Sequence, residues 1–369
     1  MVRLLVLFLL QAFCSVQLSA QVNITGKVLN DVSGDPLAGA SVYINNSTIG
    51  STTSADGSFM LSNVMPGTFD IIVTFVSFEV IVHRVSVSDK PLKFTFRMNE
   101  KATEMRNILI MSDELRRQRV AKFRELFLGI TLAAERSKIL NEDDILFEGG
   151  EKKGEIIAFS EQPLIVVNRE LGYRVYFELK EFYLDEGQGL SYFLGYTRFE
   201  DLENSNTRKW EKKRMQYYLG STMHFYHSLA DGNVEENDFR VYLVKEMEGT
   251  DMKAKVPVSG DSILSVDTVS QLKYINVQGR MIINYLKDPY HKSHLKTKSM
   301  FLTSSARGIE SSVQILEYPC YLDKSGLLEN PMSVRYSGFW GYEKLANMLP
   351  VDFNPPGRKP GVSLSQTKP

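Results

Sequence analysis

Short runs of residues with strand-like patterning recur about every ten positions through the first hundred residues of the chain. β-branched and aromatic side chains, several of them at every second position, mark residues 24–30, 41–45, 58–62, 69–76, 80–87 and 92–97. An apolar residue at alternate positions is typical of a strand with one buried face. Turn sequences such as Gly34-Asp35-Pro36 separate the runs, since proline fixes φ and glycine accepts positive φ. The pattern predicts a small β-sandwich.

A mixed segment at residues 99–111 leads into a pattern of helical period. Val120, Phe123 and Phe127 recur at spacings of three and four, so they share one face of a helix. Ser112 stands just before two acidic residues, and a serine hydroxyl at such a place accepts a free backbone N–H of the first turn. We therefore expect a helix that begins after Ser112 and ends near Gly129.

From residue 155 onward the pattern alternates between strands and a second helix. We expect strands at residues 155–160, 164–168, 173–184, 190–199, 239–244, 271–276, 281–286, 300–303 and 312–318. A helix is expected over residues 207–229, where Trp210, Arg214, Tyr218 and Phe225 fall on one stripe. Antiparallel strands with a few helices are typical of an α+β domain. The chain is therefore predicted to be mainly β, with a sandwich first and a larger antiparallel-sheet α+β domain after it.

The first twenty residues have the form of an export signal. Arg3 precedes the apolar run 4–10, and small or polar residues lead to Ala20. A secretory signal peptide has this form, with cleavage expected after Ala20. The apolar run is too short to span a membrane, and no later stretch offers about 18 apolar residues. A lipid anchor at Cys14 is the alternative, although Phe13 stands where a small residue usually precedes such a cysteine.

These patterns divide the chain into five parts. We expect a signal peptide at residues 1–20, the sandwich at 21–98, a linker at 99–111, the α+β domain at 112–350 and a flexible proline-rich tail at 351–369. The last part carries Pro355-Pro356, Pro360 and Pro369 among few apolar residues, a composition typical of extended, mobile chain.

Composition and charge exclude several classes of protein. With 369 residues, 43% hydrophobic and 24% charged, the chain is an ordinary globular protein of about two domains. The 43 basic and 44 acidic residues leave a formal charge of -1, so no overall field attracts nucleic acid, and we expect no nucleic-acid partner. Once Cys14 leaves with the signal, only Cys320 remains. No intramolecular disulfide is then possible, and we expect a buried, inert thiol.

Four ordered motifs in the predicted sandwich carry a resemblance to a known family. They are Gly26-x-Val28, Pro36-Leu37-x-Gly39-Ala40-x-Val42, Asp56-Gly57-x-Phe59 and Pro66-Gly67-x-Phe69. In this order they resemble the carboxypeptidase-regulatory-like domain family, whose fold is a transthyretin-like, seven-stranded Greek-key β-sandwich. At Ser77-Phe78 the chain departs from the glycine and aromatic residue common in that family. The resemblance implies an accessory domain, which in other proteins also opens outer-membrane receptors.

Carboxypeptidase chemistry does not follow from this resemblance. The zinc enzymes hold their metal with two histidines and a glutamate, the first pair spaced His-x-x-Glu, and none of the five histidines here has that spacing. Two His-x-x-His pairs, His224 with His227 and His291 with His294, are the alternative metal ligands. Lysines surround the second pair and oppose a divalent cation. We predict no catalytic residue, no cofactor and no metal.

The second domain also resembles a known group of proteins. The motifs are Pro163-Leu164, Asn168, Leu171-Gly172-Tyr173, Trp210, Arg214, Tyr218-Leu219-Gly220-Ser221, His224-Phe225, Gly338-Phe339-Trp340 and Met348-Leu349-Pro350. Between residues 106 and 353 they resemble the domain that follows this sandwich in uncharacterised envelope proteins of Gram-negative bacteria. The resemblance supports a protein exported to the periplasm or peripherally associated with the outer membrane. The absence of a later long apolar stretch predicts no transmembrane span.

One set of residues in the second predicted helix is a candidate ligand site. If Trp210, Arg214, Tyr218 and His224 face a cleft, they suit a carbohydrate or a peptide, because aromatic rings stack and arginine donates in a fixed geometry. The alternative is that this aromatic stripe packs into the core, as such stripes usually do.

Three functions remain open from the sequence. The first, which we favour, is an exported, non-enzymatic envelope protein, whose sandwich is an adhesive or spacing module and whose larger domain binds a glycan, peptide or protein partner. The second is an accessory component of an outer-membrane receptor system. The third is a hydrolase with an unrecognised site near His224. A deep pocket with convergent polar groups, or a filled core, distinguishes catalysis from binding.

Overall fold

The computed structural model describes residues 22–102, 106–149, 154–203, 207–246, 253–287, 304–305, 308–323 and 326–358. Several sequence expectations lie outside the described residues: the signal peptide at 1–20, the pair His291 and His294, the strand at 300–303 and the tail beyond residue 358. Among the described residues, no helix has the length and apolar character that would let it cross a bilayer.

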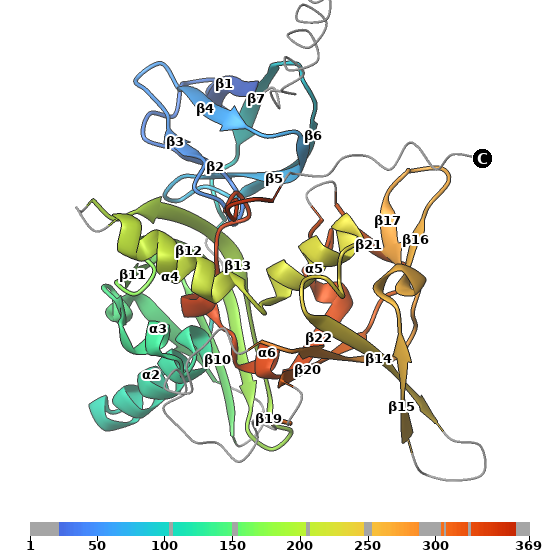
Figure 1. The fold of residues 1–369 in the computed structure, drawn as a ribbon. Coiled ribbons are helices and arrows are strands. Elements are labelled where there is room, and N and C mark those ends of the chain that lie inside the picture. Colours follow the sequence, from blue (N-terminus) through green and yellow to red (C-terminus); the bar gives the residue numbers. More distant parts are fainter. Residues whose placement is uncertain are drawn as a thin grey trace, which may run out of the picture.

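The N-terminal part is a seven-stranded β-sandwich, as predicted, and it stands at the top of Figure 1. Its strands are β1 (Val22–Asn30), β2 (Ser41–Ile44), β3 (Gly50–Thr52), β4 (Ser58–Val64), β5 (Gly67–Thr74), β6 (Ile81–Val87) and β7 (Leu92–Met98). One sheet has the order β4-β1-β7 and the other β3-β2-β5-β6. The inward residues Ile24, Leu61 and Ile71 belong to a core of the sandwich's own. Only β3 lacks a sequence signal, because three residues are too few to show a period.

The second domain begins with a sheet covered by a helix. Its strands are β8 (Ser137–Ile139), β9 (Ile145–Glu148), β10 (Glu155–Ser160), β11 (Leu164–Asn168), β12 (Tyr173–Asp185) and β13 (Leu190–Asp201). The order is β8-β11-β12-β10-β9, with β13 also paired to β12. Helix α2 (Asp113–Leu128) begins where Ser112 accepts from the Leu115 amide. Its Phe123 and Phe127 pack on Phe182 and Phe177 of β12.

The remainder of the second domain contains two further sheets and short helices. The larger sheet has the order β15-β14-β18-β20-β19, with β22 also paired to β20. Its strands are β14 (Phe239–Glu246), β15 (Lys253–Val258), β18 (Arg280–Tyr285), β19 (Ser304–Ser305), β20 (Gly308–Ile315) and β22 (Val334–Gly338). The smaller sheet holds β16 (Leu264–Val266), β17 (Lys273–Ile275) and β21 (Cys320–Leu322). The helices are α3 (Leu132–Glu135), α4 (Thr207–Tyr218), α5 (Thr222–Asp231) and α6 (Phe339–Tyr342).

The single helix expected over residues 207–229 is in fact two helices, α4 and α5. Gly220 between them has φ +78°, which ends a right-handed helix and favours glycine. Ser221 then caps α5, since its hydroxyl accepts from the His224 amide at 3.2 Å. The stripe expected along one helix is therefore divided between two helices that point in different directions (Figure 1).

The sheets and helices of the second domain share one core. Buried residues from Val120 in α2 to Leu349 near the C-terminus form one continuous hydrophobic cluster. The cluster includes Phe225 of α5, whose ring packs against Phe239 and Trp340. The α+β part therefore folds around a single interior, separate from the core of the sandwich.

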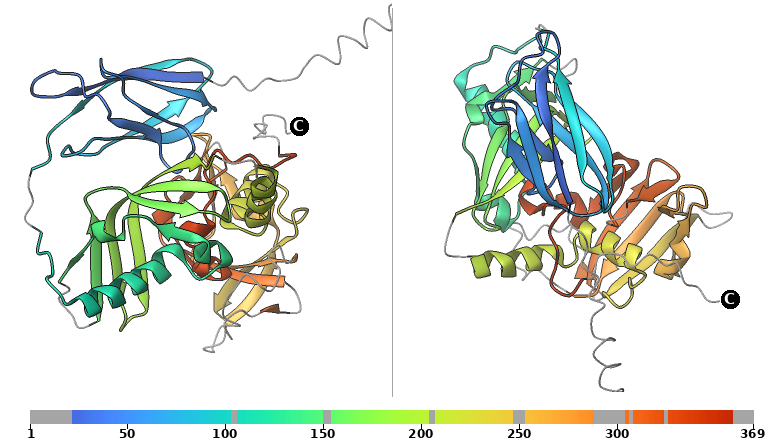
Figure 2. Two further views of the ribbon diagram at one scale, coloured as in Figure 1. Left: turned by 90° about the vertical axis from the view of Figure 1, so that its left-hand side faces the viewer. Right: turned by 90° about the horizontal axis from the view of Figure 1, so that it is seen from above.

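The sandwich is fixed to the second domain by backbone hydrogen bonds. The turn after β2 lies along the edge of β13, where the Asn46 amide donates to the Thr197 carbonyl at 2.7 Å and the Phe199 amide donates to the Ser47 carbonyl at 2.9 Å. The left view of Figure 2 shows the sandwich lying above this domain. The outward side chain of Tyr43 in β2 is only 2% exposed, which shows that the second domain covers this face.

The chain that follows the second core also contacts the sandwich. The Val351 amide donates to the Asn46 carbonyl at 2.7 Å, and Asp352 accepts from the Thr48 amide at 2.9 Å. Arg358 forms an ion pair with Asp231 of α5 at 3.0 Å. The sequence predicts a flexible tail here, but residues 351–358 are held by both domains. Proline content alone does not reveal tertiary hydrogen bonds.

Candidate functional site

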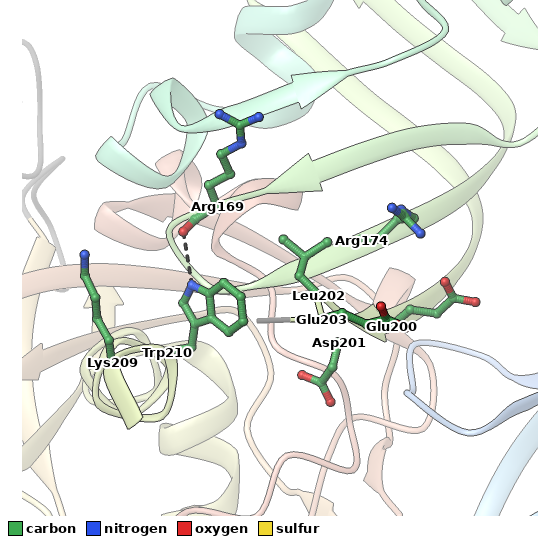
Figure 3. Close-up of a pocket in the computed structure, with 8 residues that line it drawn as sticks. All are labelled: Arg169, Arg174, Glu200, Asp201, Leu202, Glu203, Lys209 and Trp210. Carbon is green, nitrogen blue, oxygen red and sulfur yellow. Dashed lines mark hydrogen bonds between the residues drawn. The ribbon is translucent and has the colours of Figure 1, made fainter. Parts of the chain in front are cut away.

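A pocket of about 690 Å³ opens where β13 ends and α4 begins. Its lining residues are Arg169, Arg174, Glu200, Asp201, Leu202, Glu203, Lys209 and Trp210 (Figure 3). They come from the turn between β11 and β12, from β12, from the end of β13 and from the first turn of α4. Three basic and three acidic side chains therefore surround one aromatic and one aliphatic residue.

The wall of the pocket depends on close packing between Trp210 and Gly172. Gly172 has φ +72° in the turn between β11 and β12, and a Cβ atom there would overlap the indole ring of Trp210. The indole N–H donates to the Arg169 carbonyl at 3.2 Å, as the dashed line in Figure 3 shows. Trp210 is 8% exposed, so only an edge of its ring reaches the pocket.

Arg214 supports the same turn from behind. Its guanidinium donates to the carbonyls of Leu171 at 2.8 Å and Gly172 at 3.1 Å, and to the Asp201 carboxylate at 2.5 Å. The same group lies 3.7 Å from the centre of the Tyr173 ring. The hydrogen bonds of Arg214 therefore hold the wall of the pocket in place. Of the residues that it contacts here, Asp201 also lines the pocket.

A buried carboxylate anchors α4 beneath this turn. The Glu170 side chain is 1% exposed and lies 2.8 Å from Lys213 and 2.5 Å from Arg136. Burial by itself raises the pKa of Glu170, but Lys213 and Arg136 outweigh it and hold the pKa below its usual value. The charge of Glu170 is therefore compensated, and the middle of α4 is tied to the turn before β12.

Tyr218 and His224 lie in the core, away from the pocket. Their rings are 4.8 Å apart, and His224 also packs against Phe239 and Tyr285. The Gly220 amide donates to Nδ1 of His224 at 3.1 Å. Burial lowers the pKa of His224 to about 4, so the ring is neutral at pH 7. Of the four candidate residues, only Trp210 lines the pocket, with Arg214 behind it.

The second histidine of the first pair is also buried. Tyr218 Oη and His227 Nδ1 are 3.1 Å apart, and burial lowers the pKa of His227 to about 3. Both histidines therefore contact Tyr218 in the core, His224 through its ring and His227 through Nδ1. Within the described ranges, no group of three or more His, Cys, Asp or Glu side chains is arranged to hold a metal ion.

Sequence reasoning missed most of the pocket. The missed residues are Arg169, Arg174, Glu200, Asp201, Leu202, Glu203 and Lys209. One signal is present: the strand pattern of β13 ends in the polar run Glu200-Asp201-Leu202-Glu203, and ligand-binding residues often follow the ends of strands. Which turn this run faces is set by the pairing of β12 with β13, a contact between residues distant in sequence.

Comparison with known families matches the N-terminal sandwich and the segment directly after it. A model of the family described as CarboxypepD_reg-like domain matches residues 24–110, which confirms the resemblance drawn from the four sandwich motifs. Nothing among the curated proteins matches this chain in sequence.

Solved structures resemble parts of the chain weakly. A type II cohesin–X-dockerin complex of Acetivibrio cellulolyticus is 26% identical over 21% of this chain and 56% of that chain, with a TM-score of 0.19. The major pilin subunit of Bacillus cereus is 15% identical over 22% and 31%, with a TM-score of 0.19. A DUF3823 family protein of Bacteroides ovatus is 11% identical over 50% and 82%, with a TM-score of 0.18. Scores this low carry no functional argument.

Proposed function

We propose that this chain is an exported, non-enzymatic binding and scaffold protein of the cell envelope, and that its second domain binds a glycan in the pocket beside Trp210. One observation carries the proposal. The pocket presents basic and acidic side chains in equal number around the edge of an indole ring. The sandwich is the scaffold part, held rigidly beside the strand that ends at the pocket.

The balance of charge favours a neutral, polar ligand. A cation would meet Arg169, Arg174 and Lys209, and an anion would meet Glu200, Asp201 and Glu203, so neither gains from the whole site. Sugar hydroxyls donate and accept, and therefore pair with both kinds of side chain. Trp210 and Leu202 offer the apolar contact that the carbon face of a sugar needs.

Two acidic residues of the pocket are held in place before any ligand arrives. Glu200 pairs with Arg198, and Asp201 pairs with Arg214. Such preorganisation lowers the entropic cost of binding. The packing of His224 among Tyr218, Phe239 and Tyr285 argues against the hydrolase alternative, because that ring is closed off from substrate.

Calorimetric titration of the exported chain with a panel of neutral oligosaccharides tests the proposal. We expect saturable binding of at least one glycan. The double variant Lys209→Ala, Glu203→Ala removes one exposed donor and one exposed acceptor of the pocket. It should weaken binding by about 10-fold, the effect of about 1.4 kcal/mol.

Arg208→Ala is the matched control, since Arg208 is an exposed neighbour of Lys209 that does not line the pocket. Its affinity should remain that of the unaltered chain. Binding of charged peptides without any glycan would contradict the proposal and favour a peptide partner. An equal loss of affinity in the double variant and in Arg208→Ala would also count against binding in the pocket.

A further inference from the structure

A cluster of three tyrosines lies on the outer face of the small sheet formed by β16, β17 and β21. Tyr274 is central, with its ring centre 6.3 Å from that of Tyr318 and 5.8 Å from that of Tyr321. The planes of these pairs meet at 82° and 59°. The Tyr274 ring therefore meets each of its two neighbours at a steep angle.

Strand register explains why the rings point outward. Tyr274 of β17 is paired with Tyr321 of β21, and side chains alternate between the two faces of a strand. The neighbours of these tyrosines, Ile275, Cys320 and Leu322, are buried in the core. Tyr274 and Tyr321 consequently lie on the opposite face, at the side of the molecule where Figure 1 labels β17 and β21.

The cluster is accessible to solvent. Tyr318 is 48% exposed, and Tyr274 and Tyr321 are half-buried.

One carboxylate contacts the cluster directly, and two further acidic residues adjoin it through the backbone. Asp267 accepts from the Tyr321 hydroxyl at 2.8 Å, Glu317 precedes Tyr318 in the chain, and the Glu329 amide donates to the Tyr321 carbonyl at 3.0 Å. Asp267 also accepts from two backbone amides, which holds it as an anion.

Basic side chains near the cluster do not cancel this charge. Arg84 of the sandwich lies 3.3 Å from Glu329 but is shared with Asp70. Lys273 of β17 donates to the Ala230 carbonyl of α5, on the inner side of the sheet. Asp267, which accepts from the Tyr321 hydroxyl, therefore keeps its negative charge beside the rings, and a ligand that complements it is positive.

We propose that Tyr274, Tyr318 and Tyr321 form a binding site for a small quaternary ammonium cation. The faces of tyrosine rings carry negative electrostatic potential and attract a cation within about 6 Å of the ring centre. A cation above this cluster can contact the Tyr274 ring together with a neighbouring ring, and Asp267 adds electrostatic attraction. The site is separate from the pocket beside Trp210 and does not depend on a glycan.

The test compares choline with 3,3-dimethylbutanol, which has the same shape but no charge. Titrations of the full exported chain are followed by the NMR signals of the tyrosine rings. We expect choline to shift the signals of the three tyrosines, and to bind at least about 10-fold more tightly than the neutral alcohol. Equal affinity for the two compounds would overturn the proposal, because burial of methyl groups would then explain the binding.

Variants of Tyr318 locate the site. Tyr318→Leu should weaken choline binding by about 5-fold or more, while Tyr318→Phe, which keeps the ring, should retain it. Tyr242→Leu removes a half-buried tyrosine of β14 and should leave the affinity unchanged. Choline binding that survives Tyr318→Leu undiminished would overturn the assignment. Circular dichroism of each variant verifies that it is folded, so that a loss of binding reports on the ring.

Discussion

The backbone amide of Asn46 in the sandwich donates to the backbone carbonyl of Thr197 in β13 at 2.7 Å. Because both partners are main-chain groups, this contact continues the hydrogen bonding of the sheet across the boundary between domains. Thr197 is two residues from the start of the run Phe199-Glu200-Asp201, whose acidic members line the pocket. The sandwich and the pocket are therefore supported by the same strand.

Widening the interface at Gly50 should loosen the sandwich from the second domain. A Cβ atom at Gly50 would lie 2.9 Å from Cδ of Arg198, so Gly50→Val forces the arginine aside, at a cost of about 1–3 kcal/mol. We expect calorimetry to show two separate unfolding transitions in the variant, one for each domain. In the unaltered chain the transitions of the two domains should overlap more closely.

The control for this prediction is Thr52→Val on the same strand, where the side chain is exposed. This change should alter the unfolding profile little. Identical profiles for Gly50→Val and Thr52→Val would mean that Arg198 adapts without disturbing the interface.

Filling the space at Gly172 should destabilise the pocket wall. Gly172→Ala places a methyl group against the indole of Trp210 and also requires positive φ from alanine. Together these effects should lower the free energy of unfolding by about 2–4 kcal/mol. Urea denaturation measures the change.

Gly189→Ala separates the two causes. Gly189 has φ +61°, and no atom lies within 4 Å of the position that an alanine methyl group would take there, so only the backbone cost of about 1 kcal/mol applies. If Gly172→Ala lowers the free energy of unfolding no more than Gly189→Ala does, Trp210 moves freely. That result would contradict its role as a fixed wall of the pocket.

Acid should destabilise the protein through His224 and His227. Burial lowers their pKa values to about 4 and about 3, against about 6.5 for an unfolded histidine. Below pH 6.5 the unfolded state binds protons that the folded state does not. Stability is therefore complete above pH 6.5 and falls as the pH decreases toward 4, by up to about 1.4 kcal/mol per pH unit for each histidine.

Urea denaturation at pH 7.5 and pH 5 measures this effect. The variant His227→Gln should be less stable at pH 7.5, because the contact with Tyr218 changes, but its stability should decrease less between the two pH values. A decrease as large as in the unaltered chain would mean that His227 takes up its proton in the folded state as readily as in the unfolded state.

Local sequence patterns were enough to predict the sandwich and helix α2. Alternation in the first hundred residues, with turn residues at fixed places, was enough to predict the sandwich, because each strand there exposes one face and buries the other. Four ordered motifs carried the resemblance of the sandwich to its family. The period and the cap at Ser112 were likewise enough for α2, which spans Asp113–Leu128. Such features depend on residues close in sequence, and the sequence displays them directly.

Tertiary structure alone decided where the candidate residues point. Trp210 and Arg214 meet the turn at Gly172 about forty positions earlier, while the break at Gly220 rotates His224 into the core. The pocket joins the turn before β12 to the end of β13, and the tyrosine cluster joins β17 to β21. These contacts depend on strand pairing between distant segments. A pattern of apolar residues predicts only that a face is buried, and not which surface covers it.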